Sequence, residues 1–318
     1  MSEHKKIPVI LDGDPGHDDA IAWVLAKASP KLDIRAVTTC AGNQTLEKTT
    51  YNARRICTLL GIDAPIAMGL HHPLFSDPIT AGNIHGQSGL DGPALPEPAV
   101  PLSDLSAVEL MAKVLRESED KVVIIATGPE TNVAALLLAH PELKEKIAGI
   151  SVMGGGIAYG NWTAAAEFNI WADPEAAQIV MDSGCPIRII PLDATHRACI
   201  NADESKAFRA LGTPVGKAVA DCVDHRILAY SHLQPMERLD SAPIHDALAV
   251  CAVVHPEVIT KSIFTRVDID ISGGLADGQT IVDPRTYTDR PRNADFALDA
   301  DRDLFARWMM ACIQRFEG

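Results

Sequence analysis

The chain has 318 residues, of which 47% are apolar and 22% are charged, and its formal net charge is −14. This composition is typical of a soluble globular enzyme, and the length allows one large α/β domain or two smaller ones. The negative charge argues against DNA, RNA and anionic membranes as partners, because a protein that binds these polyanions needs a basic face.

The cysteines and the N-terminus indicate the cellular compartment. The seven cysteines are odd in number, scattered, and form no Cys-x-x-Cys pair. We therefore expect buried free thiols in a reducing compartment. Residues 1–6 lead into a strand pattern and not into the apolar segment of a signal peptide, and no uncharged apolar run approaches membrane-spanning length. These features predict a cytoplasmic protein.

Short apolar runs rich in β-branched residues alternate with helical patterns. In chain order, we predict strand 7–12, helix 18–29, strand 32–40, helix 45–60, helix 104–118, strand 121–126, helix 131–140, strand 147–153, helix 174–183 and strand 187–192. Continuous apolar strands are typical of a sheet that is covered on both faces. The alternation therefore predicts a mostly parallel central sheet with helices on both faces.

The pattern is less regular beyond residue 200. We predict helices 203–211, 214–232 and 245–254, strands 263–271 and 295–299, and a final helix 302–316. Because we find no linker and no internal repeat, we predict a single α/β domain over residues 1–318.

Polar or glycine-rich loops follow five of the predicted strands. These loops contain Asp12 and Asp14, residues 41–44, residues 127–129, residues 153–156, and Asp193. Ligands of open parallel sheets bind beyond the carboxyl ends of the strands, so we expect the active site at this edge. Two long loops, 69–103 and 154–173, are also expected to be ordered and functional.

The segment 12–19, Asp-Gly-Asp-Pro-Gly-His-Asp-Asp, places four carboxylates at a strand-to-helix turn. Like charges this close repel unless a cation or a shared proton relieves them. The hard oxygen ligands suit Ca²⁺ or Mg²⁺ better than Zn²⁺. The alternative is that Asp18 or Asp19 only caps the helix.

Two further segments carry candidate chemistry. His245 and Asp246 open an apolar helix, where they could be functional or only a cap beside a structural histidine. Asn161, Glu167 and Asn169 lie among alanine and phenylalanine residues, and such side chains suit the recognition of several hydroxyl groups. The alternative for these three residues is an ordinary polar loop.

In their order along the chain, these segments resemble the inosine–uridine-preferring nucleoside hydrolase family. The resemblance runs from about residue 7 to about residue 255, with a family-like C-terminal segment beyond. The matching motifs are segments 10–20, 42–45, 127–132, 153–155, 166–169, 172–177 and 244–246. Gly13 differs from the Cys or Thr that members often carry, and we expect this difference to be harmless.

The resemblance implies a calcium-dependent N-ribohydrolase that cleaves ribonucleosides to free base and ribose. The implied Ca²⁺ ligands are the carboxylates of Asp14, Asp19 and Asp246 and the backbone carbonyl of Thr127. Water and the 2′- and 3′-hydroxyls of ribose would complete the six to eight oxygen ligands of calcium.

The implied chemistry is direct attack by a metal-bound water, which Asp14 deprotonates, through an oxocarbenium-like transition state. His245 is the implied proton donor to the leaving base, since an unperturbed histidine pKa near 6.5 suits this task. His85 is either a second participant or a loop histidine that shapes a turn.

The resemblance also implies the remaining substrate contacts. Asp18 and Asn169 would bind the ribose diol, Asn161 and Glu167 the 5′-hydroxyl, and Asn43 and Met153 would belong to the same substrate pocket, while Asp12 supports the acid cluster from behind. Base specificity stays open, because segment 224–239, which offers His225, Tyr230, His232 and Gln234, does not align cleanly. By resemblance, we expect a homo-oligomer, a dimer or a tetramer.

Two other functions compete with this interpretation. One is a Mg²⁺-dependent phosphohydrolase of the haloacid dehalogenase kind, which also carries Asp-x-Asp after its first strand. The chain lacks the Thr or Val expected after the second Asp of that motif. The other is a non-catalytic protein that binds calcium or ribose, in which Asp14 and His245 would have no chemical role.

Overall fold

The computed structural model describes residues 5–234, 238–285 and 289–317. Within these residues, the main sheet has the strand order β10 (Thr280–Asp283), β9 (Ile259–Ile269), β11 (Ala294–Ala300), β6 (Ile187–Ile190), β5 (Ile147–Met153), β4 (Val122–Ala126), β1 (Ile7–Gly13), β2 (Leu32–Thr39) and β3 (Ile66–Met68). Strands β11 to β3 are parallel to their neighbours in this order, whereas β9 and β10 are antiparallel. The predicted mostly parallel sheet is confirmed.

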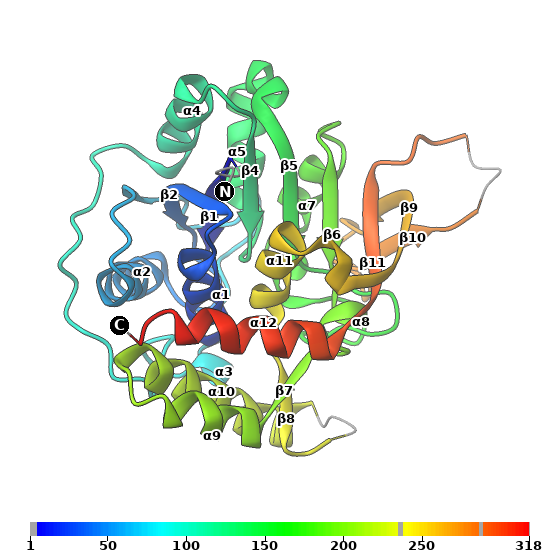
Figure 1. Ribbon diagram of the computed structural model, residues 1–318. Helices are drawn as coiled ribbons and strands as arrows, with labels where there is room; N and C mark the ends of the chain where they lie inside the picture. The colour runs from blue at the N-terminus through cyan, green and yellow to red at the C-terminus, as the bar shows by residue number, and fades with distance from the viewer. Residues whose placement is uncertain (1–4, 235–237, 286–288, 318) are drawn as a thin grey trace.

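Helices cover both faces of the sheet (Figure 1). One core lies between the sheet and α1 (His17–Ala28), α10 (Pro214–Leu233), α11 (His245–Val254) and α12 (Arg302–Gln314). The other core lies between the sheet and α4 (Ala107–Glu117), α5 (Thr131–Ala139) and α7 (Pro174–Met181). In β1, Val9 and Leu11 enter the first core while Ile10 enters the second, because successive strand residues face opposite sides of a sheet.

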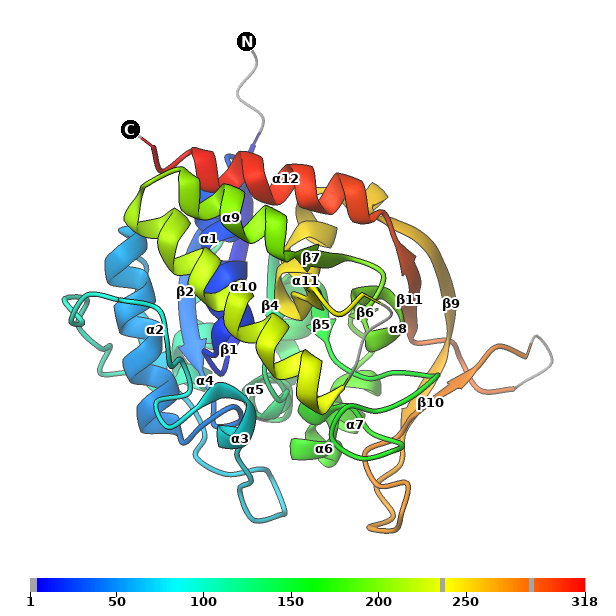
Figure 2. The ribbon, with the colours of Figure 1, turned by 90° about the horizontal axis from the view of Figure 1, so that it is seen from below.

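The remaining elements are shorter or lie at the edges of these layers. They are α2 (Leu46–Leu60), α3 (Gly82–His85), α6 (Phe168–Ala172), α8 (Leu192–Thr195), α9 (Ala202–Ala210), two 3-10 helices (Pro141–Lys146 and Pro256–Val258), and the antiparallel strands β7 (Cys199–Asn201) and β8 (Ser241–Pro243). Figure 2 shows α3 and α6 near the C-terminal end of α10, so these three helices surround one edge of the sheet.

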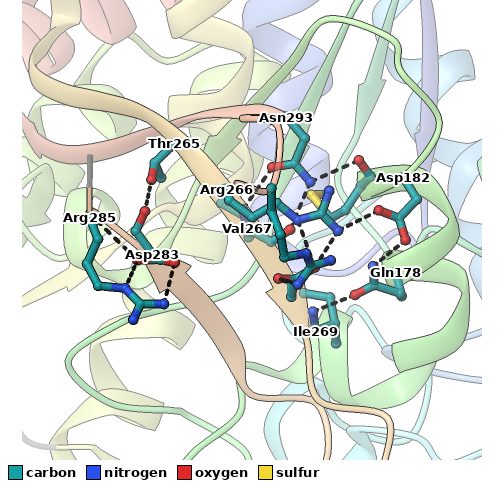
Figure 3. Close-up of polar contacts among 12 residues, drawn as sticks. Gln178, Asp182, Thr265, Arg266, Val267, Ile269, Asp283, Arg285 and Asn293 are labelled. Atoms are coloured by element: carbon teal, nitrogen blue, oxygen red, sulfur yellow. Dashed lines mark hydrogen bonds and ion pairs between the residues drawn. The ribbon is translucent and has the colours of Figure 1, made fainter. Parts of the chain in front are cut away.

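Polar contacts hold the antiparallel edge of the sheet against α7 (Figure 3). Oε1 of Gln178 accepts a hydrogen bond from the backbone N–H of Ile269 at 2.6 Å, and Nη2 of Arg266 donates to Oδ1 of Asp182 at 2.6 Å. Nδ2 of Asn293 donates to the backbone carbonyls of Met181 and Val267. These contacts satisfy buried polar groups where the strand direction changes.

The structure differs from the predicted elements in three respects. The predicted strand 187–192 ends at Ile190, because Pro191 has no N–H to continue the ladder, and α8 follows. The long loops 69–103 and 154–173 contain the short helices α3 and α6. Strands β3, β7, β8 and β10 were not predicted, since three or four residues are too few to display a period.

The thiols agree with the prediction. All seven cysteines are free, and six are buried while Cys199 is partly exposed. In the described part of the chain, no helix combines the length and the apolar character that a membrane span requires.

Candidate active site

A cavity lies beyond the carboxyl ends of the parallel strands. Its walls come from the start of α1, from the loops that follow β2, β4 and β5, and from α3, α6, α10 and α11. Ten predicted site residues line it: Asp18, Asn43, His85, Thr127, Met153, Asn161, Glu167, Asn169, His245 and Asp246. The other two, Asp14 and Asp19, are fully buried and contact the lining residue Asn43.

Asp193 does not join this group. It lies in α8, and its carboxylate accepts hydrogen bonds from the backbone N–H groups of Ile157 (2.8 Å) and Ala158 (3.3 Å). It lines a second, neighbouring cavity instead. The expectation that five strand ends converge on one site is therefore wrong for Asp193, whose carboxylate anchors a loop.

Three buried carboxylates from two distant segments meet at the cavity floor. Asp18, Asp19 and Asp246 each offer one oxygen, and these oxygens lie within 4.8 Å of one another. Burial, together with repulsion from Asp18, raises the pKa of Asp19 to about 6, and the same two causes raise the pKa of Asp246 well above its usual range. A bound cation would relieve both the desolvation and the repulsion.

Asp14 lies beside this group rather than within it. Its Oδ2 accepts a 2.6 Å hydrogen bond from the backbone N–H of Asn43, while its buried Oδ1 has no partner among the described residues. A Cβ on Gly128 would come within 2.8 Å of Oδ1, and a Cβ on Gly42 would overlap Oδ2. The backbone thus closes tightly around a carboxylate whose free oxygen is available to a ligand.

Thr127, itself a predicted metal ligand, contacts a second predicted ligand and a predicted substrate-binding residue. Its hydroxyl donates to Oδ1 of Asp19 at 2.8 Å, and its backbone carbonyl accepts from Nδ2 of Asn169 at 2.9 Å. A Cβ on Gly13 would lie 2.5 Å from Oδ1 of Asp19 and 2.6 Å from the Thr127 hydroxyl. Glycine at position 13 leaves room for this contact, and the expectation that its difference from other family members is harmless stays a prediction.

Helix capping and support account for two acids of the 12–19 segment. Oδ2 of Asp19 accepts from the backbone N–H of Gly16 at 3.0 Å, so Asp19 caps α1 as well as facing the cluster. Oδ1 of Asp12 accepts from the Thr38 hydroxyl (2.6 Å) and from Nδ2 of Asn132 (2.9 Å). Asp12 thus ties β1 to β2 and α5, as its predicted supporting position requires.

The polar residues of the 154–173 loop hold one another in place. Oε2 of Glu167 caps α6 by accepting from the backbone N–H of Ile170 and also accepts from that of Gly155, both at 3.2 Å. Burial raises the pKa of Glu167 to about 7. Oδ1 of Asn161 accepts from the N–H of Phe168 at 2.8 Å. The loop is ordered by these contacts, and the same side chains face the cavity.

Asn169 connects two strand ends. Its Nδ2 donates to the backbone carbonyls of Thr127, at 2.9 Å, and Met153, at 3.0 Å. Since an amide carries both a donor and an acceptor group, its Oδ1 can still accept a hydrogen bond from a ligand.

Both ring nitrogens of His245 are engaged. Nδ1 lies 2.7 Å from the Thr195 hydroxyl, and Nε2 lies 2.5 Å from the Tyr230 hydroxyl. Burial, and next the positive charge of Arg226, lowers the pKa of His245 well below its ordinary value. The unperturbed pKa assumed from sequence is therefore wrong for this site, because the buried environment favours the neutral ring.

His85 belongs to a cluster of three histidines. Its Nδ1 lies 3.2 Å from Nδ1 of His17, whose Nε2 lies 2.8 Å from the backbone carbonyl of Asp91. The ring of His225 stacks on the ring of His17, with their centroids 3.8 Å apart. Nε2 of His225 lies 2.8 Å from the backbone carbonyl oxygen of Ile84. His85 thus both lines the cavity and holds the α3 segment against α1.

Helix α10 supplies residues that the sequence left unassigned. Arg226, Tyr230 and Gln234 line the cavity, whereas His232 is exposed. Residues 235–237 of segment 224–239 lie outside the described residues. Arg226 was not predicted as a site residue, although its spacing to Tyr230 places both residues on one face of the predicted helix 214–232.

Comparison with known proteins shows the family to which the chain belongs. A sequence profile of the inosine-uridine preferring nucleoside hydrolase family matches residues 9–307. The chain is 50% identical over 300 residues to the pyrimidine-specific ribonucleoside hydrolase RihA of Escherichia coli O127:H6 and to that of Shigella boydii serotype 4, covering 94% of this chain and 96% of each relative.

Solved structures show the same fold. A purine-preferring ribonucleoside hydrolase from Gardnerella vaginalis superposes with a TM-score of 0.90 at 32% identity, covering 98% of this chain and 99% of the other. A plant nucleoside hydrolase, the PpNRh1 enzyme, superposes with a TM-score of 0.89 at 26% identity, covering 97% and 99%. The chain therefore belongs to the inosine-uridine preferring nucleoside hydrolase family of ribonucleoside-cleaving enzymes.

Proposed function

We propose that this protein hydrolyses the N-glycosidic bond of pyrimidine ribonucleosides, with Ca²⁺ as its metal, to give free base and ribose. The observation that carries the proposal is the group of buried carboxylates Asp18, Asp19 and Asp246 on the floor of a cavity lined by polar side chains. The preference for pyrimidines rests on the RihA relatives, which share half of their residues with this chain.

The donor set fits a hard cation. The carboxylates of Asp14, Asp19 and Asp246 and the backbone carbonyl of Thr127 would hold it, and all four groups are oxygens. The unpartnered Oδ1 of Asp14 supports this assignment, because a buried carboxylate oxygen without a donor is costly. When bound, calcium would supply positive charge that makes water more acidic and that attracts the sugar hydroxyls.

Asp14 is the proposed general base. Its Oδ2 is held by the N–H of Asn43, so its Oδ1 can accept the proton of the attacking water. The water oxygen forms a bond to C1′ as the bond from C1′ to the base nitrogen breaks, and the bonding pair leaves with the base. In the described residues no second carboxylate is assigned as a covalent nucleophile, so direct attack by water remains the proposed route.

The sugar would bind through residues of two segments, the start of α1 and the loop 154–173. Asp18 and Asn169 would accept hydrogen bonds from the 2′- and 3′-hydroxyls, and Asn161 and Glu167 would contact the 5′-hydroxyl. Glu167 at this position would disfavour a 5′-phosphate, which is a reason to propose nucleosides over nucleotides. His245, with Tyr230 at 2.5 Å, is proposed to assist the leaving base. We further propose that the protein acts in the cytoplasm as a homo-oligomer.

The test is a substrate panel with and without a chelator. We expect release of the free base from uridine and cytidine, less from inosine, almost none from 2′-deoxyuridine, and loss of activity on chelation that calcium restores. Loss of the 2′-hydroxyl removes one predicted ligand contact, so it should reduce turnover strongly. Phosphate release from p-nitrophenyl phosphate without ribose release from any nucleoside would instead support the phosphohydrolase alternative and contradict the proposal.

A further inference from the structure

A buried arginine that the proposed chemistry has not used lies in the wall of the cavity. Arg226 is 4% exposed and lies on α10 one helical turn before Tyr230, and Gln234 directly follows the last residue of this helix. All three residues line the cavity. A guanidinium keeps its positive charge at any physiological pH, so this wall carries a permanent cation.

The protein satisfies only part of this guanidinium. Nη2 lies 3.5 Å from Oδ2 of Asp18 and 3.5 Å from the Tyr230 hydroxyl, and the group lies over the Tyr230 ring at 5.1 Å. Its buried Nε has no hydrogen-bond partner among the described residues. A guanidinium offers five N–H donors, and buried donors without acceptors cost free energy. Among the described residues only Nη2 makes polar contacts, and Arg226 lines the cavity, so a ligand there can accept hydrogen bonds from the guanidinium.

The position of Arg226 indicates which part of the ligand accepts its hydrogen bonds. The guanidinium contacts Tyr230, whose hydroxyl lies 2.5 Å from Nε2 of His245, the residue proposed to assist the leaving base. The same nitrogen, Nη2, lies 3.5 Å from Oδ2 of Asp18, which is proposed to bind the sugar diol. Arg226 therefore contacts both a proposed sugar-binding residue and the tyrosine beside His245, which places it near the bond that breaks in the proposed binding mode.

Bond cleavage creates an anionic acceptor at this place. When the bond between C1′ and N1 of a pyrimidine breaks, the electron pair stays on the base, and the O2 carbonyl next to N1 shares the negative charge. Fixed donors aimed at charge that develops during a reaction are among the largest contributions to catalysis. A purine has no carbonyl next to its glycosidic nitrogen, so the same donor would serve it less well.

We propose that Arg226 donates hydrogen bonds to the O2 carbonyl of the departing pyrimidine and stabilises the negative charge that cleavage places on the base. The arginine keeps its protons throughout, and the freed base takes its proton afterwards from water or from the Tyr230–His245 pair. This inference rests on the proposed function and adds to it a leaving-group residue and a structural cause for pyrimidine preference.

The test compares two substrates that differ in how much help the leaving group needs. The leaving group of uridine is uracil, which leaves poorly as an anion. The leaving group of p-nitrophenyl β-D-ribofuranoside is p-nitrophenolate, which is a stable anion. We expect Arg226→Gln to lower kcat/KM for uridine by ~100-fold or more and to lower it for the riboside by less than ~10-fold, as removal of one charge-stabilising donor does elsewhere. The advantage of 5-fluorouridine over uridine should also widen, because its base is the more stable anion.

Two further variants control for charge and folding. Arg197 is exposed and lies at the neighbouring cavity, so Arg197→Gln removes one positive charge nearby and should leave the ratio of the two substrates unchanged. Arg226→Lys keeps the charge beside Asp18 but lacks the planar fork. Arg226→Lys should show the same selective loss of kcat/KM on uridine to a smaller degree. This variant therefore tests the proposal even if Arg226→Gln does not fold.

The outcomes separate this inference from the proposed function. Equal losses on uridine and on the riboside in both Arg226 variants would show that Arg226 only positions Asp18, and would overturn the inference while the proposed function stands. If the unaltered protein released no ribose from uridine, the proposed function would fall and the inference with it. A selective loss on uridine, with Arg197→Gln unchanged, supports the assignment.

Discussion

The backbone N–H of Asn43 donates a 2.6 Å hydrogen bond to one carboxylate oxygen of Asp14, and the other oxygen is buried without a partner among the described residues. Asn43 follows β2 and Asp14 follows β1, so two neighbouring parallel strands together orient this carboxylate. The free oxygen is the one that we assign to catalysis.

Asp14→Asn tests this assignment. The amide has almost the same shape, but it cannot accept a proton from water and is a weaker cation ligand. We expect kcat for uridine to fall by ~1,000-fold or more, while the thermal unfolding midpoint does not fall, because the change removes a charge from a repelling cluster. Asp63→Asn, at an exposed site, is the control. An Asp14→Asn protein with near-normal turnover would remove the base assignment.

His245 and Tyr230 should act on the leaving group as a pair. We expect His245→Ala to slow cleavage of inosine and uridine by ~100-fold and cleavage of p-nitrophenyl riboside far less, because that phenolate leaves unaided. Tyr230→Phe should reproduce part of this selective loss, since the Tyr230 hydroxyl lies 2.5 Å from Nε2 of His245. The measurement is the ratio of kcat/KM values, and similar losses on all substrates would contradict an acid role.

Glu167 should discriminate against nucleotides. Glu167→Gln can keep the cap of α6 through its amide oxygen, but above pH 7, where the Glu167 carboxyl with its pKa of about 7 is mostly ionised, it removes the negative charge that would repel a 5′-phosphate. We expect the preference for uridine over uridine 5′-monophosphate to shrink by ~10-fold, which corresponds to ~1.4 kcal/mol. The two kcat/KM values provide the comparison. An unchanged ratio would place the 5′-hydroxyl elsewhere in the cavity.

Glu130 should make the fold less stable as pH rises. It is fully buried, neither carboxyl oxygen has a partner among the described residues, and burial raises its pKa well above the usual range. A group whose pKa is raised by folding binds more protons in the folded state, so its stabilising contribution is complete below the unfolded pKa of about 4.3 and is lost as pH rises.

Glu130→Met removes this titration. At pH 7 we expect a gain of ~1–3 kcal/mol in the free energy of unfolding, and a weaker decline of stability between pH 5 and pH 8. Urea unfolding at several pH values measures both. Glu117→Met, at an exposed position of α4, is the matched control. Parallel stability curves for Glu130→Met and the unaltered protein would contradict the prediction.

Gly13 should matter for metal affinity. A Cβ at this position would press on both Asp19 and Thr127, which are proposed ligands. We expect Gly13→Ala to weaken calcium binding by ~10-fold, as displaced supporting groups do at other metal sites. Gly149→Ala is the control, because a Cβ there would meet only the Pro186 carbonyl at 3.5 Å. Titration calorimetry with calcium is the measurement, and equal affinities would show that the site adapts.

Local sequence determined much of this protein. The alternation of apolar strands and helical patterns identified β1, β2, β4, β5 and β6 and the parallel sheet, because strand and helix periods are short-range properties. The acidic turn between β1 and α1 was recognisable for the same reason, since its carboxylates are neighbours in sequence. The family followed from motifs in a fixed order.

Only the tertiary structure decided which of these groups meet. Asp246 joins Asp18 and Asp19 across more than 220 residues of chain, and Tyr230 meets His245 because α10 crosses the edge where α11 begins. Nothing in the sequence near Arg226, apart from its helical spacing, indicated a site residue. Asp193 follows a strand as other site residues do, but it lines another cavity. Long-range partners depend on the path of the backbone, and short patterns in a sequence carry no record of that path.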